Sequence, residues 1–209
     1  MAFATTRLRW IRASGVLALL LAAALAGIGA GTALAGGKLD QQNPHTDGGG
    51  FGAGIQMTIT DGQTFTAGKT GSLDRVAVYL ERDFGETLPA GKIFLDIYPT
   101  TSAGAPKTNG PALGSGSIAT TAVTQAGFSV FSLSHPTPVK KGTVYAIVLH
   151  ANVSIEFAIA WDGNGGVTGP GPYPRGGNVQ RTDDNSPWDV FPSQDHYFKT
   201  FVTVRHKRH

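Results

Sequence analysis

Short runs of alternating apolar and polar residues, separated by glycine and proline, make up most of this 209-residue chain. Alternation with a period of two is typical of strands that bury one face. The pattern predicts strands at residues 55–60, 63–66, 73–81, 92–98, 116–123, 128–133, 144–151, 154–161 and about 197–204. No stretch has a convincing helical period, so we expect an all-β fold. The expected architecture is a two-sheet antiparallel β-sandwich, with a jelly roll favoured over an immunoglobulin-like order.

The connections between these strands are predicted from local sequence. Asp61-Gly62 is a strong signal for a tight hairpin between residues 55–60 and 63–66, because a type I′ turn needs positive φ at both central residues. Residues 143–162 are too long a run for one strand, so we expect a second hairpin at Ala151-Asn152-Val153. Residues 100–114 and 163–195 are rich in Gly and Pro and are expected to be long loops, where binding often occurs.

The first 35 residues have the layout of an export signal. Three arginines and no acidic residue precede an apolar stretch that begins at Val16, and Ala33-Leu34-Ala35 before Gly36 is the pattern that signal peptidase reads. The alternative is an uncleaved anchor, because residues 16–35 are long enough to cross a bilayer. The second half of that stretch is mostly Ala and Gly, which insert weakly. We therefore expect cleavage, a secreted protein and no later transmembrane segment.

The rest of the chain is expected to have three parts. Residues 36–54 contain Gly48-Gly49-Gly50 and few apolar side chains, which predicts a flexible, Gly-rich lead. Residues 55–204 form the single β-sandwich domain, and residues 205–209 form a basic tail.

Charge and cysteine content narrow the classes of function. Of the 17 Lys and Arg residues, three lie in the export signal, which leaves 14 basic and 14 acidic residues. Such a balance provides no electrostatic reason to bind nucleic acid. The chain has no Cys, which excludes disulfide frameworks, thiol catalysis and Cys-ligated zinc.

Several segments, taken in order, resemble a known kind of secreted domain. Gln63-Thr64-Phe65-Thr66 and Gly71-Ser72-Leu73 are followed by residues 76–80 and 91–98, and later by residues 141–149, Trp161 and residues 198–201. This order is similar to the β-sandwich domains of secreted and surface-anchored bacterial proteins of the "choice-of-anchor" kind, which are similar in style to jelly-roll carbohydrate-binding modules. The resemblance covers residues 54–204 and implies export and a sandwich fold. It implies no agreed ligand and no catalytic residue.

Outward-facing aromatic residues predict a surface that binds carbohydrate. If the apolar positions of residues 73–81 and 92–98 face the core, the residues between them face outward. The candidate ligand-binding residues are then Tyr79, Phe94, Asp96 and Tyr98, together with Trp188 in the second long loop. Sugar rings stack on aromatic faces while polar side chains pair with their hydroxyls. The alternative is that a strand, a loop or the Gly-rich lead covers these aromatic residues.

Patterns for metals and catalysis are weak. Asp162-Gly163-Asn164-Gly165 resembles the start of a calcium loop, with Asp162 and Asn164 as candidate ligands. It lacks the later bidentate Glu and is equally a plain turn, so we expect no cofactor.

A glycosidase needs two carboxylates placed across the sugar. Glu156 and Asp96 are mid-strand acids that could serve, although such residues are more often solvated on the outer face.

These observations predict an exported, non-catalytic binding or surface-interaction module. The expected partner is a carbohydrate or cell-envelope glycan, or a surface protein. The first alternative is a self-associating structural protein of the envelope or extracellular matrix, which needs an exposed sheet edge or apolar patch. The second alternative is a hydrolase built around Glu156 or Asp96.

Overall fold

The computed structural model describes residues 36–44, 53–55, 59–81, 88–153, 157–159, 161–163 and 172–204, with the backbone alone at 53–54, 157–159 and 161–163. All of these residues belong to one compact unit, residues 35–209. They form a 3-10 turn at Thr120–Ala122 and the following strands: β1 (Lys38–Asn43), β2 (Ala53–Ile55), β3 (Thr60–Thr66), β4 (Gly71–Glu81), β5 (Lys92–Pro99), β6 (Gly114–Ala119), β7 (Ala126–Val139), β8 (Val144–Ala151), β9 (Phe157–Ile159), β10 (Trp161–Gly163), β11 (Asn178–Arg181), β12 (Asp189–Phe191), β13 (Gln194–His196) and β14 (Phe198–Thr203).

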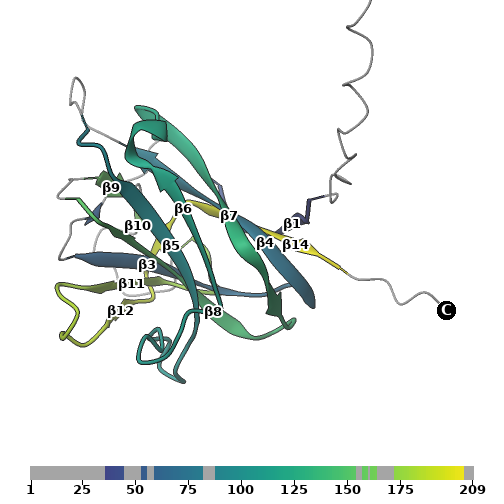
Figure 1. The fold of residues 1–209 in the computed structure, drawn as a ribbon. Helices are drawn as coiled ribbons and strands as arrows, with labels where there is room; N and C mark the ends of the chain where they lie inside the picture. The colour runs from purple at the N-terminus through teal and green to yellow at the C-terminus, as the bar shows by residue number, and fades with distance from the viewer. Residues whose placement is uncertain are drawn as a thin grey trace, which may run out of the picture. The chain divides into compact units, whose positions relative to one another are not determined.

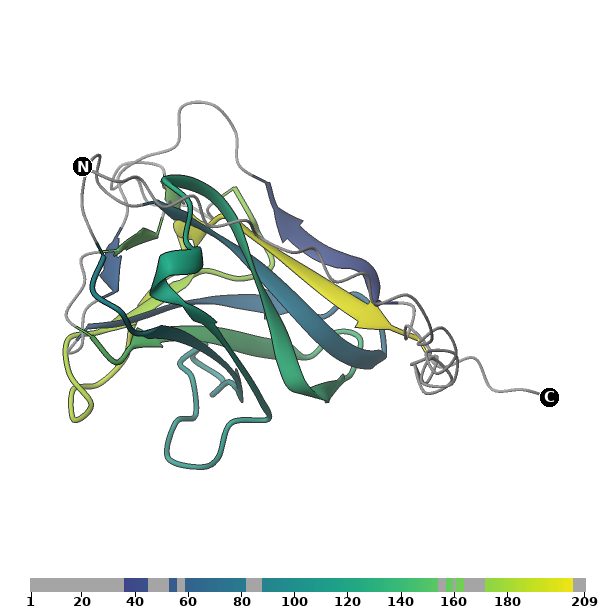
Figure 2. The same ribbon diagram turned by 45° about the horizontal axis from the view of Figure 1, so that its top comes forward.

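The strands form two six-stranded antiparallel sheets and one two-stranded ribbon (Figure 1). The first sheet has the order β1-β14-β4-β9-β2, with β7 also paired to β4. The second sheet has the order β12-β11-β3-β8-β5-β6, and the ribbon pairs β10 with β13. The two sheets pack against each other as layers, which Figure 2 shows from a second direction. The predicted all-β sandwich is therefore confirmed, while the preference for a jelly-roll order stays a prediction.

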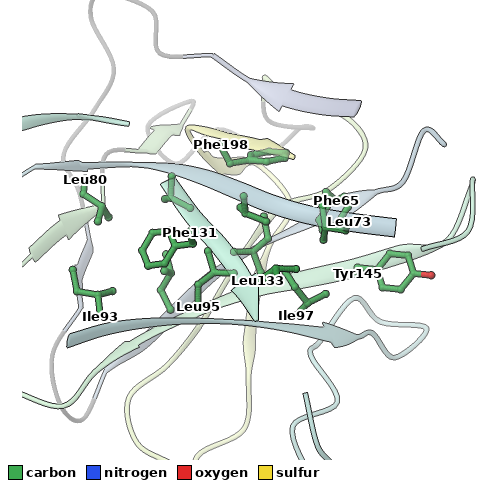
Figure 3. Packing of buried hydrophobic residues seen from close by; sticks show 14 of the residues in the cluster. Phe65, Leu73, Leu80, Ile93, Leu95, Ile97, Phe131, Leu133, Tyr145 and Phe198 are labelled. Atoms are coloured by element: carbon green, nitrogen blue, oxygen red, sulfur yellow. The ribbon is translucent and has the colours of Figure 1, made fainter. Parts of the chain in front are cut away.

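The core lies between the two sheets. The inward side chains of β4 and β5 are almost fully buried and point toward one another in Figure 3. Phe131 of β7 lies between them and is itself 0% exposed. Burying one such side chain stabilises the fold by about 1.5–3 kcal/mol. The inward residues of these two strands are Leu73, Val76, Val78, Leu80, Ile93, Leu95 and Ile97.

The hairpin predicted at Asp61-Gly62 is wrong. β3 runs without interruption from Thr60 to Thr66 and pairs with β8 on one side and β11 on the other. Gly62 has no positive φ. Glycine is required there because a Cβ at Gly62 would lie 2.3 Å from the carbonyl oxygen of Ile147. The residue reflects a close approach of two backbones, which is the other common reason for glycine in a strand.

The hairpin predicted at Ala151-Asn152-Val153 is also wrong. β8 ends at Ala151, as expected, but it belongs to the second sheet. The next strand, β9, pairs with β2 and β4 of the first sheet. The chain therefore crosses between the sheets here. Apolar residues that face the core look alike in either sheet, so the pattern could not distinguish a hairpin from a crossing.

Two segments expected to lack strands contain them. Within the predicted flexible lead, residues 36–54, β1 pairs with β14 along its whole length. Within the predicted loop, residues 163–195, β11 pairs with both β3 and β12. These strands bury polar side chains that are hydrogen-bonded, including Gln41, Asn43 and Asn178. Apolar alternation does not mark such strands.

Residues 55–60, predicted as one strand, hold the end of β2 at Ile55 and the start of β3 at Thr60, and residues 56–58, 154–156 and 160 lie outside the described residues. The other predicted strands agree with the structure to within their ends. Residues 73–81, 92–98 and 144–151 correspond to β4, β5 and β8, and β14 covers most of residues 197–204. β7 extends beyond residues 128–133 at both ends, and the run at 116–123 ends in the 3-10 turn. Residues 1–35 and 205–209, predicted as export signal and basic tail, lie outside the described residues.

A cluster of polar side chains is buried where β3, β11 and β13 meet. His196 Nε2 lies 2.8 Å from Asp61 Oδ1, and Asn178 Nδ2 lies 2.8 Å from the same imidazole nitrogen. Asp61 is 0% and His196 is 1% exposed. Gln63 Nε2 donates a 2.7 Å hydrogen bond to Asp195 Oδ1, which extends the cluster. A buried polar group that loses its hydrogen-bond partner is costly, so these side chains favour the observed arrangement of the three strands.

Candidate functional site

The outer face of the second sheet carries a polar hollow of about 180 Å³. Its side chains meet because β5, β8, β3 and β11 are neighbours: Asp96 lies opposite Val148, and Thr60 lies opposite Arg181. The loop after β5 and the loop after β11 complete the wall. The residues that line the hollow are Thr60, Asp96, Tyr98, Thr108, Val148, His150, Arg181 and Asp184.

Asp96 is the more enclosed of the two carboxylates in the hollow, with 17% of its side chain exposed. Its Oδ1 accepts a 2.5 Å hydrogen bond from Ser115 Oγ on β6, and its Oδ2 lies 3.2 Å from His150 Nε2 on β8. Burial by itself raises the pKa of Asp96, but the hydrogen bonds from His150 and Ser115 together outweigh burial and lower it. The carboxylate is therefore an ionised acceptor at neutral pH.

Arg181 supplies the guanidinium of the hollow, and 15% of its side chain is exposed. Its Nη2 donates a 2.7 Å hydrogen bond to Asp184 Oδ1, so the pair forms a salt bridge at the mouth of the hollow. Its Nη1 donates a 3.3 Å hydrogen bond to the Asp184 carbonyl. Its Nε is buried and has no hydrogen-bond partner among the described residues.

Trp188 and Thr108 hold Arg181 in place. The Arg181 guanidinium lies over the Trp188 ring at 4.9 Å from its centroid, in a cation–π contact. The indole Nε1 of Trp188 donates a 3.3 Å hydrogen bond to Thr108 Oγ1. The loop that carries Trp188 is shaped by Asp183, whose Oδ1 accepts from the Ser186 backbone N–H at 2.8 Å. The hydrogen bond from the Ser186 hydroxyl also lowers the pKa of Asp183.

The loop that carries Thr108 folds back on itself. The Thr101 N–H donates to the Ala105 carbonyl at 2.8 Å, and Gly104 adopts φ +88°, a value that favours glycine. The Lys107 N–H then donates to the Pro99 carbonyl at 2.9 Å. These bonds return the chain to the end of β5, which places Thr108 beside the hollow.

Tyr98 is the aromatic residue that lines the hollow, and it is half-buried. Among the described residues, its ring takes part in no aromatic stacking and no cation–π contact. Partial burial and the negative charge of Asp96 raise the pKa of Tyr98, against a smaller opposing effect of Arg181. Its hydroxyl is therefore neutral and can both donate and accept a hydrogen bond.

The structure separates the predicted binding residues into two groups. Phe94, Asp96, Tyr98 and Trp188 lie on or beside the outer face of the second sheet. The Phe94 ring is stacked on His150 with centroids 5.0 Å apart, and Trp188 is stacked on Arg181, so each has one face engaged. Tyr79 lies on β4 of the first sheet and packs edge-on against Phe128 and Tyr197. It belongs to another surface and is no part of the hollow.

Several residues of the hollow were not predicted from the sequence. His150 could have been found, because it alternates with the buried Ile147 and Leu149 of β8 and so faces outward. Arg181 and Asp184 carried no such signal, since the whole of residues 163–195 read as a loop. Thr108 also lies in a predicted loop, and only the fold brings it to Arg181.

The arrangement around Asp96 differs from that of a nucleophilic triad. The carboxylate stands between the Ser115 hydroxyl and the His150 imidazole, whereas nucleophilic catalysis requires the imidazole next to the hydroxyl. Glu156, the other acid considered for a hydrolase, lies outside the described residues. So do Asn164 and the side chain of Asp162, the candidate calcium ligands. In the described part of the chain, no group of three His, Cys, Asp or Glu side chains could hold a metal ion.

Comparison with other proteins adds no assignment. No protein-family model matches this chain, and no curated protein sequence matches it. Within the described ranges, no helix is both long enough and apolar enough to cross a membrane.

Proposed function

We propose that the chain is an exported, non-catalytic binding module that holds carbohydrate in the hollow on the second sheet. One observation carries the proposal: the ring of Tyr98 lines a hollow together with the charged side chains of Asp96, Arg181 and Asp184. A sugar ring needs an aromatic face for its C–H groups and planar charged or polar groups for its hydroxyls. The hollow combines both.

The polar groups of the hollow are oriented before a ligand arrives. Ser115 and His150 hold Asp96, and Trp188 and Asp184 hold Arg181. A site whose side chains are already ordered loses less conformational entropy on binding. The Asp96 carboxylate stands between the Ser115 hydroxyl and the His150 imidazole, an order that favours binding over nucleophilic catalysis.

Export is supported by the sequence of residues 1–35, and the absence of Cys is compatible with it. A glycan outside the cytoplasm would then be the accessible ligand. The near balance of acidic and basic residues beyond residue 35 favours an uncharged polymer over nucleic acid.

The first test is retention of the purified protein on a panel of immobilised polysaccharides and cell-wall glycans. We expect selective retention, and Tyr98→Ala should weaken it by at least about tenfold, as expected for loss of a central contact. Tyr98→Phe keeps the ring and should keep most of the retention if stacking is the main interaction. Unchanged melting of both variants would show that the fold is intact.

Phe201→Ala is the matched control. Phe201 lies on β14 of the first sheet and is covered by the Arg75 guanidinium at 4.8 Å, much as Trp188 is covered by Arg181. Its removal should leave glycan retention unchanged. Equal losses from Phe201→Ala and Tyr98→Ala would place the binding surface elsewhere.

No retention on any glycan would overturn the proposal. The self-associating structural protein would then be the better account if the protein formed oligomers that depend on concentration. Leu39 of β1 and Val130 of β7, which are 42% and 52% exposed, would be the first residues to examine.

A further inference from the structure

The size of the hollow limits what it can hold. Its volume of about 180 Å³ slightly exceeds a cavity of about 150 Å³ that accommodates one benzene ring. A hollow of this size therefore matches one six-membered ring. A second hollow shares Thr108 and is lined by Thr101, Pro106, Lys107 and Asn109, none of which is aromatic. It offers no face on which a second sugar could stack.

The charges of the hollow limit the ligand further. Two carboxylates, Asp96 and Asp184, face a single guanidinium, Arg181, which is already paired with Asp184. His150 is engaged with Asp96. A ligand carboxylate would meet two negative charges. It would also compete with Asp184 for the Arg181 guanidinium. An uncharged ring with hydroxyl groups meets no such repulsion.

The side chains of the hollow can make further hydrogen bonds of the kind that ligand hydroxyl groups need. Each oxygen of Asp96 accepts one described bond, and a carboxylate oxygen can accept a second. The neutral hydroxyl of Tyr98 lines the same hollow and can donate or accept a hydrogen bond. A sugar hydroxyl can donate to Asp96, whereas a carboxylate ligand cannot.

We infer that the hollow binds one uncharged six-membered sugar ring, stacked on Tyr98 and bonded to Asp96, at a chain end or as a side branch. This inference rests on the proposed carbohydrate-binding function and specifies its ligand class. It excludes uronic acids and binding that needs several consecutive sugars.

The test is competition for a polysaccharide that retains the purified protein. The competitors are methyl glycosides of glucose, galactose and mannose, the corresponding uronic acids, and neutral oligosaccharides of two to six units. At least one neutral methyl glycoside should release the protein, and its acid counterpart should be about tenfold weaker or worse. Oligosaccharides should gain less than about threefold over the single ring, because the additional units lack a stacking surface.

Asp184→Asn tests the charge argument directly. Asp184 is 87% exposed and the amide keeps an oxygen for Arg181, so the fold should be retained. This variant should reduce the preference for neutral over acidic sugars several-fold. Asp189→Asn removes an exposed carboxylate on β12 outside the hollow and should leave the preference unchanged.

The outcomes separate this inference from the proposed function. Release by oligosaccharides alone, or by uronic acids as readily as by neutral sugars, would overturn the single neutral ring while carbohydrate binding stands. An unchanged preference in Asp184→Asn would also count against it. Failure of every glycan to retain the protein would overturn the proposed function itself.

Discussion

At the scale of single residues, glycine is required in this chain both where two backbones approach closely and where a turn has positive φ. Gly62 lies in the middle of β3, where its Cα faces the backbone of β8, and Gly104 lies in a left-handed turn of the loop after β5. The first position depends on a strand more than 80 residues away, and the second depends only on its immediate neighbours. Sequence alone therefore indicates the role of Gly104 more readily than that of Gly62.

Gly62→Ala should lower the free energy of unfolding by about 1–3 kcal/mol, because the added Cβ would overlap the Ile147 carbonyl oxygen and push β3 from β8. Urea unfolding measures this difference. Gly110→Ala is the control, since nothing lies within 4 Å of the Cβ it would add. That variant should change stability by no more than about 0.5 kcal/mol. Equal effects at the two positions would contradict the close-approach explanation.

At the scale of elements, polar strands complete the sandwich. β1 has the sequence Lys-Leu-Asp-Gln-Gln-Asn, and its residues Gln41 and Asn43 are buried against β14. Gln41 Oε1 accepts a 2.9 Å hydrogen bond from the Tyr173 hydroxyl. Burial raises the pKa of Tyr173 to about 12, so this hydroxyl remains a donor at neutral pH. β1 also covers the edge of β14 that would otherwise be open to another chain.

Gln41→Ala should destabilise the protein by about 1–3 kcal/mol, because the buried Tyr173 hydroxyl loses its acceptor. Gln42→Ala removes the neighbouring exposed side chain of the same type and should change stability by no more than about 0.5 kcal/mol. Thermal melting of the two variants provides the comparison. If Gln41→Ala were as stable as Gln42→Ala, β1 would contribute little to the fold.

At the scale of the whole molecule, the two sheets share one core. Phe131 belongs by its strand to the first sheet but packs in the same apolar cluster as the inward residues of β5 and β8 in the second. A hydrogen bond joins the loops that carry Thr108 and Trp188, and Thr108 lines the hollow on the second sheet. Loosening the core should therefore affect both sheets and the hollow together.

Phe131→Ala should lower the free energy of unfolding by about 3–5 kcal/mol, because it leaves a cavity between the sheets. Unfolding followed by circular dichroism, which reports strands, and by tryptophan fluorescence should give coincident transitions before and after the substitution. Val130→Ala alters the adjacent exposed residue and should have little effect. Separate transitions for the two signals would show that the sheets unfold independently.

The candidate site was predicted in part. Alternation along β5 placed Phe94, Asp96 and Tyr98 outward, and the structure agrees. The sequence could not show that Phe94 and Trp188 have a face covered by His150 and Arg181, since those contacts come from other elements. Tyr79 looked equivalent to Tyr98 by alternation, yet it lies on the other sheet.

The sequence by itself determined where most strands lie and which of their residues face the core, because alternation of side chains is a local property of an extended backbone. It did not determine which strands pair, since burial in either sheet requires the same apolar pattern. The crossing between β8 and β9, the polar strands β1 and β11, and the meeting of Asp96 with Arg181 were decided by the tertiary structure. Each depends on contacts between residues far apart in the chain, and these form only when the two sheets close on their common core.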